Sequence, residues 1–237
     1  MALINVSSPL TADANEGRIV SNPERMGNRR WGQKVFLSGT EQPIEVALNG
    51  AFNGLGMIET LALQGRVFIC SDADENDRVT GQTSFANTTP TWLLNIPSGT
   101  TAIPLYVNLT QAGTVAGGDV SIRIAVDNAL RFSSGGTIET VYNPRTSSGL
   151  INLCTLYSGA TATNAYGIRL FSAVTAADVS PAEGAVQGPY WQAELPYFLE
   201  GPGAFLVYTD AGTTGPTWEW SIAWAEVPTS ELPRFNE

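Results

Sequence analysis

The feature that most constrains the fold is a long series of short segments in which apolar and polar residues alternate, separated by Gly, Thr, Asn and Pro. The alternation is clearest in residues 103–109, 119–127 and 217–227. A period of two residues is that of a β-strand with one buried face. Further strands are predicted at 31–38, 44–49, 55–63, 66–71, 78–85, 91–96, 136–142, 150–157, 165–172, 190–199 and 204–209.

The same alternation predicts which side chains point inward, because residues two apart share one face of a strand. In the first two of these clearest strands, one face is apolar throughout. The residues predicted to face inward are Ile103, Leu105, Val107 and Leu109 in the first strand, and Val120, Ile122, Ile124 and Val126 in the second.

Helical signals are weak. The best candidate is 175–184, where Pro181 and Gly184 limit a helix to about two turns. Strands that follow one another without helices between them favour antiparallel sheets, and no fixed-period repeat indicates a propeller or solenoid. We therefore predict an all-β fold, an antiparallel β-sandwich of jelly-roll type, over 31–228. Residues 1–30 are predicted to be an extended N-terminal arm and 229–237 a short C-terminal tail.

The composition suits a sheet surface that contacts other chains. Charged residues make up 14% of the 237 residues, where about 25% is usual, so Thr, Ser, Asn and Gln must supply much of the polar surface. A chain of this length buries enough surface to fold without disulfides or metals.

The net charge of −10 is unevenly distributed. Residues 1–34 carry Arg18, Arg25, Arg29, Arg30 and Lys34 against three acids. The remaining body is acidic, so nucleic acid and anionic membranes are disfavoured as its partners. For the basic arm, three interpretations stay open: a tail without a role, docking onto an acidic neighbouring subunit, or contact with nucleic acid.

No secretory leader is recognised at the start, and no window approaches 18 apolar residues. We therefore expect synthesis in the cytoplasm and no membrane insertion. Three triplets match the glycosylation motif, but without a leader we expect them to be coincidental.

The chain has no histidine and one lysine. Ser-His-Asp and Cys-His catalysis and histidine-based zinc sites are therefore excluded, and no Walker loop or dinucleotide fingerprint is present. We expect no enzyme and no cofactor. A carboxylate-based glycosidase or lyase stays open among the 22 acidic residues.

One acidic segment has the spacing of oxygen ligands. Asp72, Asp74 and Asp77 lie within six residues, and carboxylates in such an arrangement suit Ca²⁺. The segment departs from an EF-hand loop, which needs Gly at Asp77 and Glu at Thr83. A solvated hairpin tip is the competing interpretation.

Aromatic residues gather near the C-terminal end: Tyr190, Trp191, Trp218, Trp220 and Trp224. Rings on a β face suit carbohydrate stacking, because they offer flat apolar area with polar edges. Tryptophans that alternate along a strand also suit the space between two sheets or a subunit interface. All three interpretations stay open.

Cys70 and Cys154 both lie in apolar segments. We expect two reduced, buried thiols, while a disulfide between them remains an alternative that sequence cannot decide.

The layout resembles that of a known class of proteins. An Arg-bearing arm precedes a Thr- and Gly-rich series of β segments, followed by Glu200-Gly-Pro-Gly-Ala-Phe-Leu-Val-Tyr-Thr and then Thr217-Trp-Glu-Trp-Ser-Ile-Ala-Trp-Ala-Glu-Val-Pro. This resembles tailed-phage virion proteins with jelly-roll folds, above all capsid decoration (cement) and head-surface proteins. The resemblance implies trimers or larger rings whose terminal arms bind neighbours, and transfers no functional residue.

We therefore expect a non-enzymatic structural protein of the virion. It would form a homo-oligomer and attach to other virion proteins such as the major capsid protein. The alternative is a carbohydrate-binding or receptor-binding module with a glycan ligand.

Overall fold

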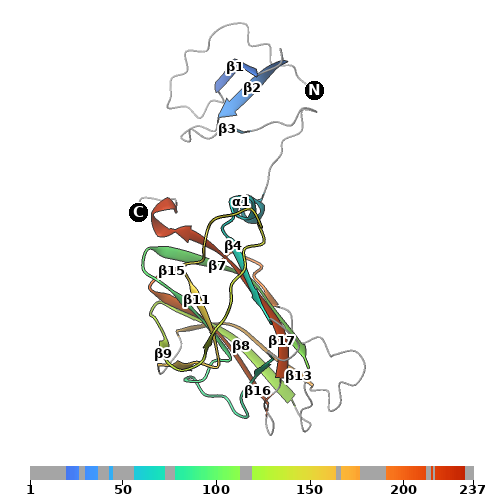
Figure 1. The fold of residues 1–237 in the computed structure, drawn as a ribbon, viewed down its shortest axis with the longest axis vertical. Helices are drawn as coiled ribbons and strands as arrows, with labels where there is room; N and C mark the ends of the chain where they lie inside the picture. The colour runs from blue at the N-terminus through green and yellow to red at the C-terminus, as the bar shows by residue number, and fades with distance from the viewer. Residues whose placement is uncertain are drawn as a thin grey trace. The chain divides into compact units, whose positions relative to one another are not determined.

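The computed structural model describes residues 56–72, 78–112, 119–163, 167–176, 191–211, 215 and 217–232, together with the backbone of 20–26, 30–36 and 43–44. The chain divides into two compact units, Met1–Gly56 and Met57–Glu237. Figure 1 labels many of the strands of both units.

The first unit contains a three-stranded antiparallel sheet of β1 (Val20–Met26), β2 (Arg30–Phe36) and β3 (Pro43–Ile44). β1 lies in the segment expected to be an extended arm, and it pairs with β2 along its whole length. The boundary between the units falls at Gly56, later than the predicted start of the sandwich at residue 31. The partner strand β2 lies almost entirely beyond residue 30, so the sequence of residues 1–30 alone does not indicate that β1 forms a strand.

The second unit is an antiparallel β-sandwich, as predicted. One sheet, called here the β17 sheet, has the order β14-β7-β17-β4, with β15 paired to β7 and β5 paired to β17. Its strands are β4 (Val67–Ser71), β5 (Val79–Thr80), β7 (Thr100–Gln111), β14 (Trp191–Gln192), β15 (Leu199–Glu200) and β17 (Thr217–Pro228).

The other sheet, called the β16 sheet, has the order β10-β11-β6-β16-β8-β13. Two further short strands, β9 (Phe132–Ser134) and β12 (Thr161–Ala162), pair with each other. The strands of the β16 sheet are β6 (Trp92–Ile96), β8 (Asp119–Asp127), β10 (Thr137–Ile138), β11 (Thr155–Ser158), β13 (Ile168–Ala176) and β16 (Gly203–Ala211).

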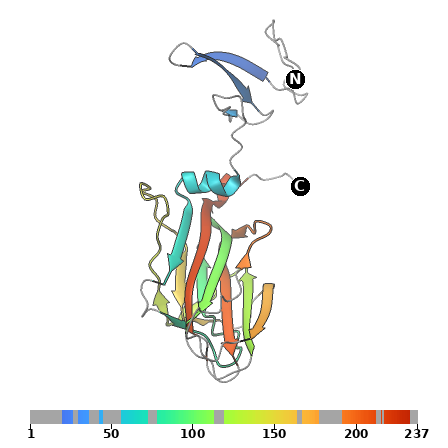
Figure 2. The same ribbon diagram turned by 90° about the vertical axis from the view of Figure 1, so that its right-hand side faces the viewer.

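The main core lies between the two sheets, whose strands Figure 2 shows in a second view. The inward face predicted for β8 is confirmed, because Val120, Ile122, Ile124 and Val126 all belong to this core. The alternating residues Trp218, Trp220, Ile222 and Trp224 of β17 belong to it as well. For β7 the prediction is half wrong. Val107 and Leu109 face the core, but Ile103 belongs to a separate cluster against which Leu105 packs.

A β-bulge explains the difference. Ala223 lies opposite Tyr106 and Trp224 opposite Pro104, so Leu105 has no partner residue on β17. An extra residue in one strand reverses which face the following side chains occupy. Ile103 therefore packs on the outer side, together with Leu61.

Leu61 belongs to the helix α1 (Met57–Leu63), in a segment predicted to be a strand. That prediction is wrong: Met, Glu, Leu and Ala are strong helix formers, and one helix face is enough to cover the end of the β17 sheet. α1 lies at the same end of the domain as the 3₁₀ turn η1 (Thr229–Glu231) (Figure 1). Of the helix predicted at 175–184, the first two residues end β13 and the rest lie outside the described residues.

Candidate functional site

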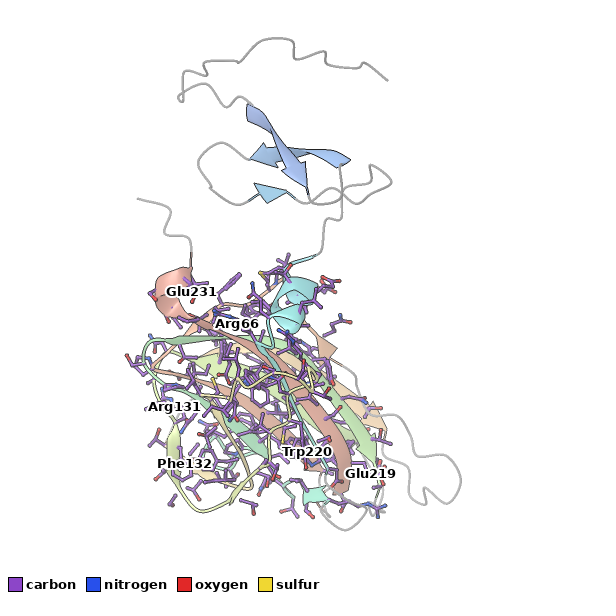
Figure 3. All side chains as sticks on the ribbon, turned by 45° about the horizontal axis from the view of Figure 1, so that its top comes forward. Arg66, Arg131, Phe132, Glu219, Trp220 and Glu231 are labelled. Carbon is purple, nitrogen blue, oxygen red and sulfur yellow. The ribbon has the colours of Figure 1, made fainter. Side chains whose placement is uncertain are left out.

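Of the three interpretations of the tryptophans, the structure supports the space between the two sheets. Trp218, Trp220 and Trp224 are at most 5% exposed, and Trp191 is 7% exposed. Trp220 packs against Trp92 of the opposite sheet, with ring centroids 5.4 Å apart, and its position on β17 is visible in Figure 3. Burial removes these four rings from the surface of the chain. Tyr190 lies outside the described residues.

The predicted calcium ligands are described only in part. Asp72 follows β4 and is half-buried, and its N–H donates to the Trp220 carbonyl at 3.1 Å. Asp74 and Asp77 lie outside the described residues. Within the part of the chain that the structure describes, no three His, Cys, Asp or Glu side chains are grouped to hold a metal.

Three of the five basic residues proposed for docking fall on the first unit's sheet. Arg25 lies opposite Trp31 in the register, Arg30 opposite Met26, and Lys34 opposite Asn22. Arg18 and Arg29 lie outside the described residues. A docking role for the group stays a prediction.

Both cysteines are free thiols buried in the sandwich, as predicted. Burial, followed by the negative charge of Glu139, raises the pKa of Cys70 to about 12. Burial, with Glu226 as the second cause, raises the pKa of Cys154 far above its ordinary value. The Cys70 thiol donates a hydrogen bond to the Thr140 carbonyl at 3.0 Å.

That hydrogen bond helps to fix a segment that closes one side of the sandwich. Residues 139–142, called here the crossing segment, run from one sheet to the other. Glu139 N donates to the Leu156 carbonyl at 3.0 Å, in the β16 sheet. Tyr142 exchanges two 2.8 Å backbone hydrogen bonds with Ile69, on the edge strand β4 of the β17 sheet.

A cleft of about 570 Å³ opens beside the crossing segment. One wall comes from β5 and the end of β4, and the other from β10 and the end of β11. In the second wall, Gly136 allows the chain before β10 to lie close to the end of β11, because a Cβ there would lie 2.6 Å from the Ser158 carbonyl oxygen. The polar lining consists of Ser71, Arg78, Thr80, Thr137, Glu139, Thr140, Tyr142 and Ser158.

Arg78 is held at the cleft by an ion pair with Glu219, at 2.8 Å between Nη2 and Oε1. Glu219 lies next to Trp220 on β17 (Figure 3). Both side chains are partly exposed, so the pair contributes little to stability, but it restricts where the guanidinium lies. One of its five N–H groups makes this bond.

A buried carboxylate anchors the chain that follows the crossing segment. Glu226 is 6% exposed and accepts hydrogen bonds from three N–H groups: Leu153 N at 2.7 Å, Cys154 N at 3.1 Å and Trp224 Nε1 at 2.8 Å. Sequence reasoning missed this residue. The signal was present, because Glu226 continues the spacing of two that places Trp220, Ile222 and Trp224 in the core.

β13, an edge strand of the β16 sheet, is not covered in the way that β4 is. β13 pairs with β8 on one side, and no described segment pairs with its other side. Ile168 is 66% exposed and Val174 63% exposed. A long edge strand with exposed apolar residues offers backbone groups to another strand.

Comparisons with known proteins add nothing to this description: no protein family, curated protein or solved structure matches the chain. No helix among the described residues is long and apolar enough to span a bilayer.

Proposed function

We propose that this chain is a non-enzymatic structural protein that self-associates through the outer edge of β13 and forms part of a virus particle surface. The observation that supports self-association most directly is the exposure of Ile168 and Val174 on an edge strand. Pairing with the same strand of a second copy satisfies the backbone groups of both edges at once.

The sequence of β13 is compatible with pairing to itself. Arg169 is the one charged residue of the strand. In an antiparallel pair centred on Ser172, the two Arg169 residues lie at opposite ends of the seam, beyond the β-bulge at Leu170, so no like charges meet. The expected product is a two-fold symmetric dimer with a sheet that continues through both subunits.

The order of the strands supports a jelly roll, the architecture expected from the resemblance to virion proteins. Eight strands, β4, β6, β7, β8, β13, β14, β16 and β17, form nested pairs: the first with the eighth, second with seventh, third with sixth, and fourth with fifth. We infer that the sandwich is a jelly roll, in which a long folded ribbon wraps around the core. Viral capsid proteins and lectins both use this architecture.

The test is the mass of the full chain in solution. The monomer has a mass of 25.2 kDa, so light scattering coupled to size exclusion separates monomer from dimer. We expect a dimer that a Val174→Lys substitution weakens at least tenfold, because a lysine on an edge strand opposes pairing. Leu195→Lys is the matched control, since Leu195 is 72% exposed and lies away from β13 in the sequence.

A wild-type monomer at every accessible concentration would refute self-association. A trimer, the state that the resemblance implies, would contradict two-fold pairing through β13, as would a dimer that Val174→Lys leaves intact.

Attachment to the particle is proposed to use the basic residues near the N-terminus. Cosedimentation with virus particles is expected for the full chain, and reduced for a variant with Arg25 and Arg30 replaced by Gln. Equal cosedimentation of the wild type and this variant would show that Arg25 and Arg30 do not contribute to attachment.

A further inference from the structure

The cleft beside the crossing segment is built to keep its shape. Its floor is tied to the β16 sheet at Glu139, to the Cys70 thiol at Thr140 and to β4 at Tyr142. Because hydrogen bonds fix the backbone of the crossing segment at these three residues, the segment does not need to become ordered when a ligand binds. A site already formed before binding avoids that entropic cost.

The volume of the cleft fits a small ligand. About 570 Å³ lies within the 300–1,000 Å³ that small-molecule sites occupy. Buried clefts of that size are lined mostly by apolar groups, whereas this lining is rich in hydroxyl groups. Five Ser or Thr side chains contribute: Ser71, Thr80, Thr137, Thr140 and Ser158.

The charged groups at the cleft disfavour an anion. Arg78 and Glu139 line it, and Arg78 is already paired with Glu219, so an anionic ligand would meet two carboxylates near a single guanidinium. The remaining lining is dominated by hydroxyl-bearing residues, which suit an uncharged ligand with many hydrogen-bonding groups.

Exposed apolar surface is also present at the cleft. The Tyr142 side chain is 55% exposed and Ile138 is 66% exposed, although both line a concave site. An aromatic ring left accessible beside hydroxyls and charged side chains provides a stacking surface with polar groups around it.

We propose that this cleft binds a neutral saccharide. The sugar hydroxyls are bound by Arg78, Glu139 and the Ser and Thr hydroxyls, because a guanidinium donates and a carboxylate accepts from neighbouring hydroxyl groups. The apolar face of the sugar ring stacks on Tyr142. The proposed carbohydrate site thus lies beside the crossing segment rather than at the buried tryptophans.

The experiment uses the full-length protein on an array of neutral gluco-, manno- and galacto-oligosaccharides, with sulfated and sialylated glycans and extended peptides as comparison arms. The strongest neutral ligand is then titrated by calorimetry against wild type and variants. We expect binding to neutral oligosaccharides, and an affinity for the chosen ligand that falls about tenfold in Tyr142→Ala.

Two further variants separate binding from folding. Glu139→Gln changes the charge with little change in shape, and Arg78→Gln removes the guanidinium; each is expected to weaken binding at least fivefold. Phe198→Ala is the matched control, because Phe198 is an aromatic side chain with 45% exposure outside the cleft lining. Its affinity is expected to equal that of wild type, and unchanged melting temperatures show that the variants remain folded.

Absence of binding to every neutral glycan overturns the proposal, as does preference for sulfated or sialylated glycans or for extended peptides. Binding that Tyr142→Ala, Glu139→Gln and Arg78→Gln all leave unchanged also overturns it, since the ligand then lies elsewhere. The proposal does not rest on self-association, because glycan affinity and solution mass are independent measurements.

Discussion

β4 and β13 are both edge strands, so each has backbone N–H and C=O groups on its outer side that no strand of its own sheet pairs. The two edges differ in what covers those groups. On β4, Ile69 is paired by Tyr142 from the crossing segment, so this edge is covered by the protein's own chain. On β13, apolar side chains are exposed and no described strand pairs with the outer side. One edge is thus closed by the chain itself, and the other is the edge proposed for self-association.

The covering of β4 comes from the chain between β8 and β13. That stretch includes the crossing segment and the residues anchored by Glu226, and it also forms one wall of the cleft. Stability and the proposed saccharide site are therefore linked on the closed side. Substitutions of buried or closely packed residues on the closed side should change the free energy of unfolding, those of the exposed cleft side chains should change ligand binding, and those on β13 should change association.

The largest loss is expected for Glu226→Ala. It leaves Leu153 N, Cys154 N and Trp224 Nε1 without their acceptor, and a buried donor without a partner costs about 1–3 kcal/mol. We expect a loss of about 3 kcal/mol or more in urea denaturation. Glu226→Gln, which retains one acceptor oxygen, should lose less. A loss below about 1 kcal/mol for the alanine variant would show that these contacts do not anchor the segment.

A smaller loss is expected for Gly136→Ala. Gly136 has φ +75° and a Cβ there would meet the Ser158 carbonyl, whereas its neighbour Gly135 has φ +69° and open space. Gly135→Ala should therefore cost about 1 kcal/mol for the backbone conformation alone, and Gly136→Ala about 2 kcal/mol or more. Equal melting temperatures for the two variants would argue against the close approach of the cleft wall.

The thiols give the closed side a dependence on alkaline pH. The pKa of Cys70 is raised from 9.0 to about 12, so the folded state keeps a proton that the unfolded state loses. Stability is full below pH 9 and falls as pH rises toward 12, by about 1.4 kcal/mol per pH unit for this thiol. The slope of unfolding free energy between pH 9 and 11 should be shallower in Cys70→Ala. Parallel slopes would mean that Cys70 ionises equally in both states.

The smallest effect on stability is expected on the exposed edge. Val174 is 63% exposed, so Val174→Lys should change the unfolding free energy of the monomer by less than about 0.5 kcal/mol while it weakens association. Thermal melting at a dilution where wild type is monomeric measures this. A large loss for the monomer would show that Val174 supports the fold itself.

Much of the fold could be predicted from local pattern. The alternation along β8 identified its inward residues, and that along β17 identified which residues share a face, because the pleat alone fixes which side chains lie together. The same rule failed halfway along β7, where a bulge at Leu105 reverses the faces. It also missed α1, since a short apolar segment suits a strand or a helix and the covered sheet end decides between them.

The candidate site was hardly predictable. Glu139 and Tyr142 lay in one expected strand, 136–142, and nothing local indicated that its end would cross from one sheet to the other. The regularly alternating tryptophans, for which core, interface and sugar stacking were all open, fill the core, whereas the exposed ring at the cleft is Tyr142, which the sequence did not single out. Burial cannot be inferred from residue type alone.

By itself, the sequence determined an all-β chain, the antiparallel class of its sheets, the inward face of β8 and the apolar setting of the two cysteines. These features follow from the period of the strand, from short connections and from the preference of apolar groups for the interior. The tertiary structure decided which strands are neighbours, which edge is covered and where a cleft opens. Those outcomes depend on contacts between residues such as Ile69 and Tyr142, far apart in the chain, whose pairing no local pattern specifies.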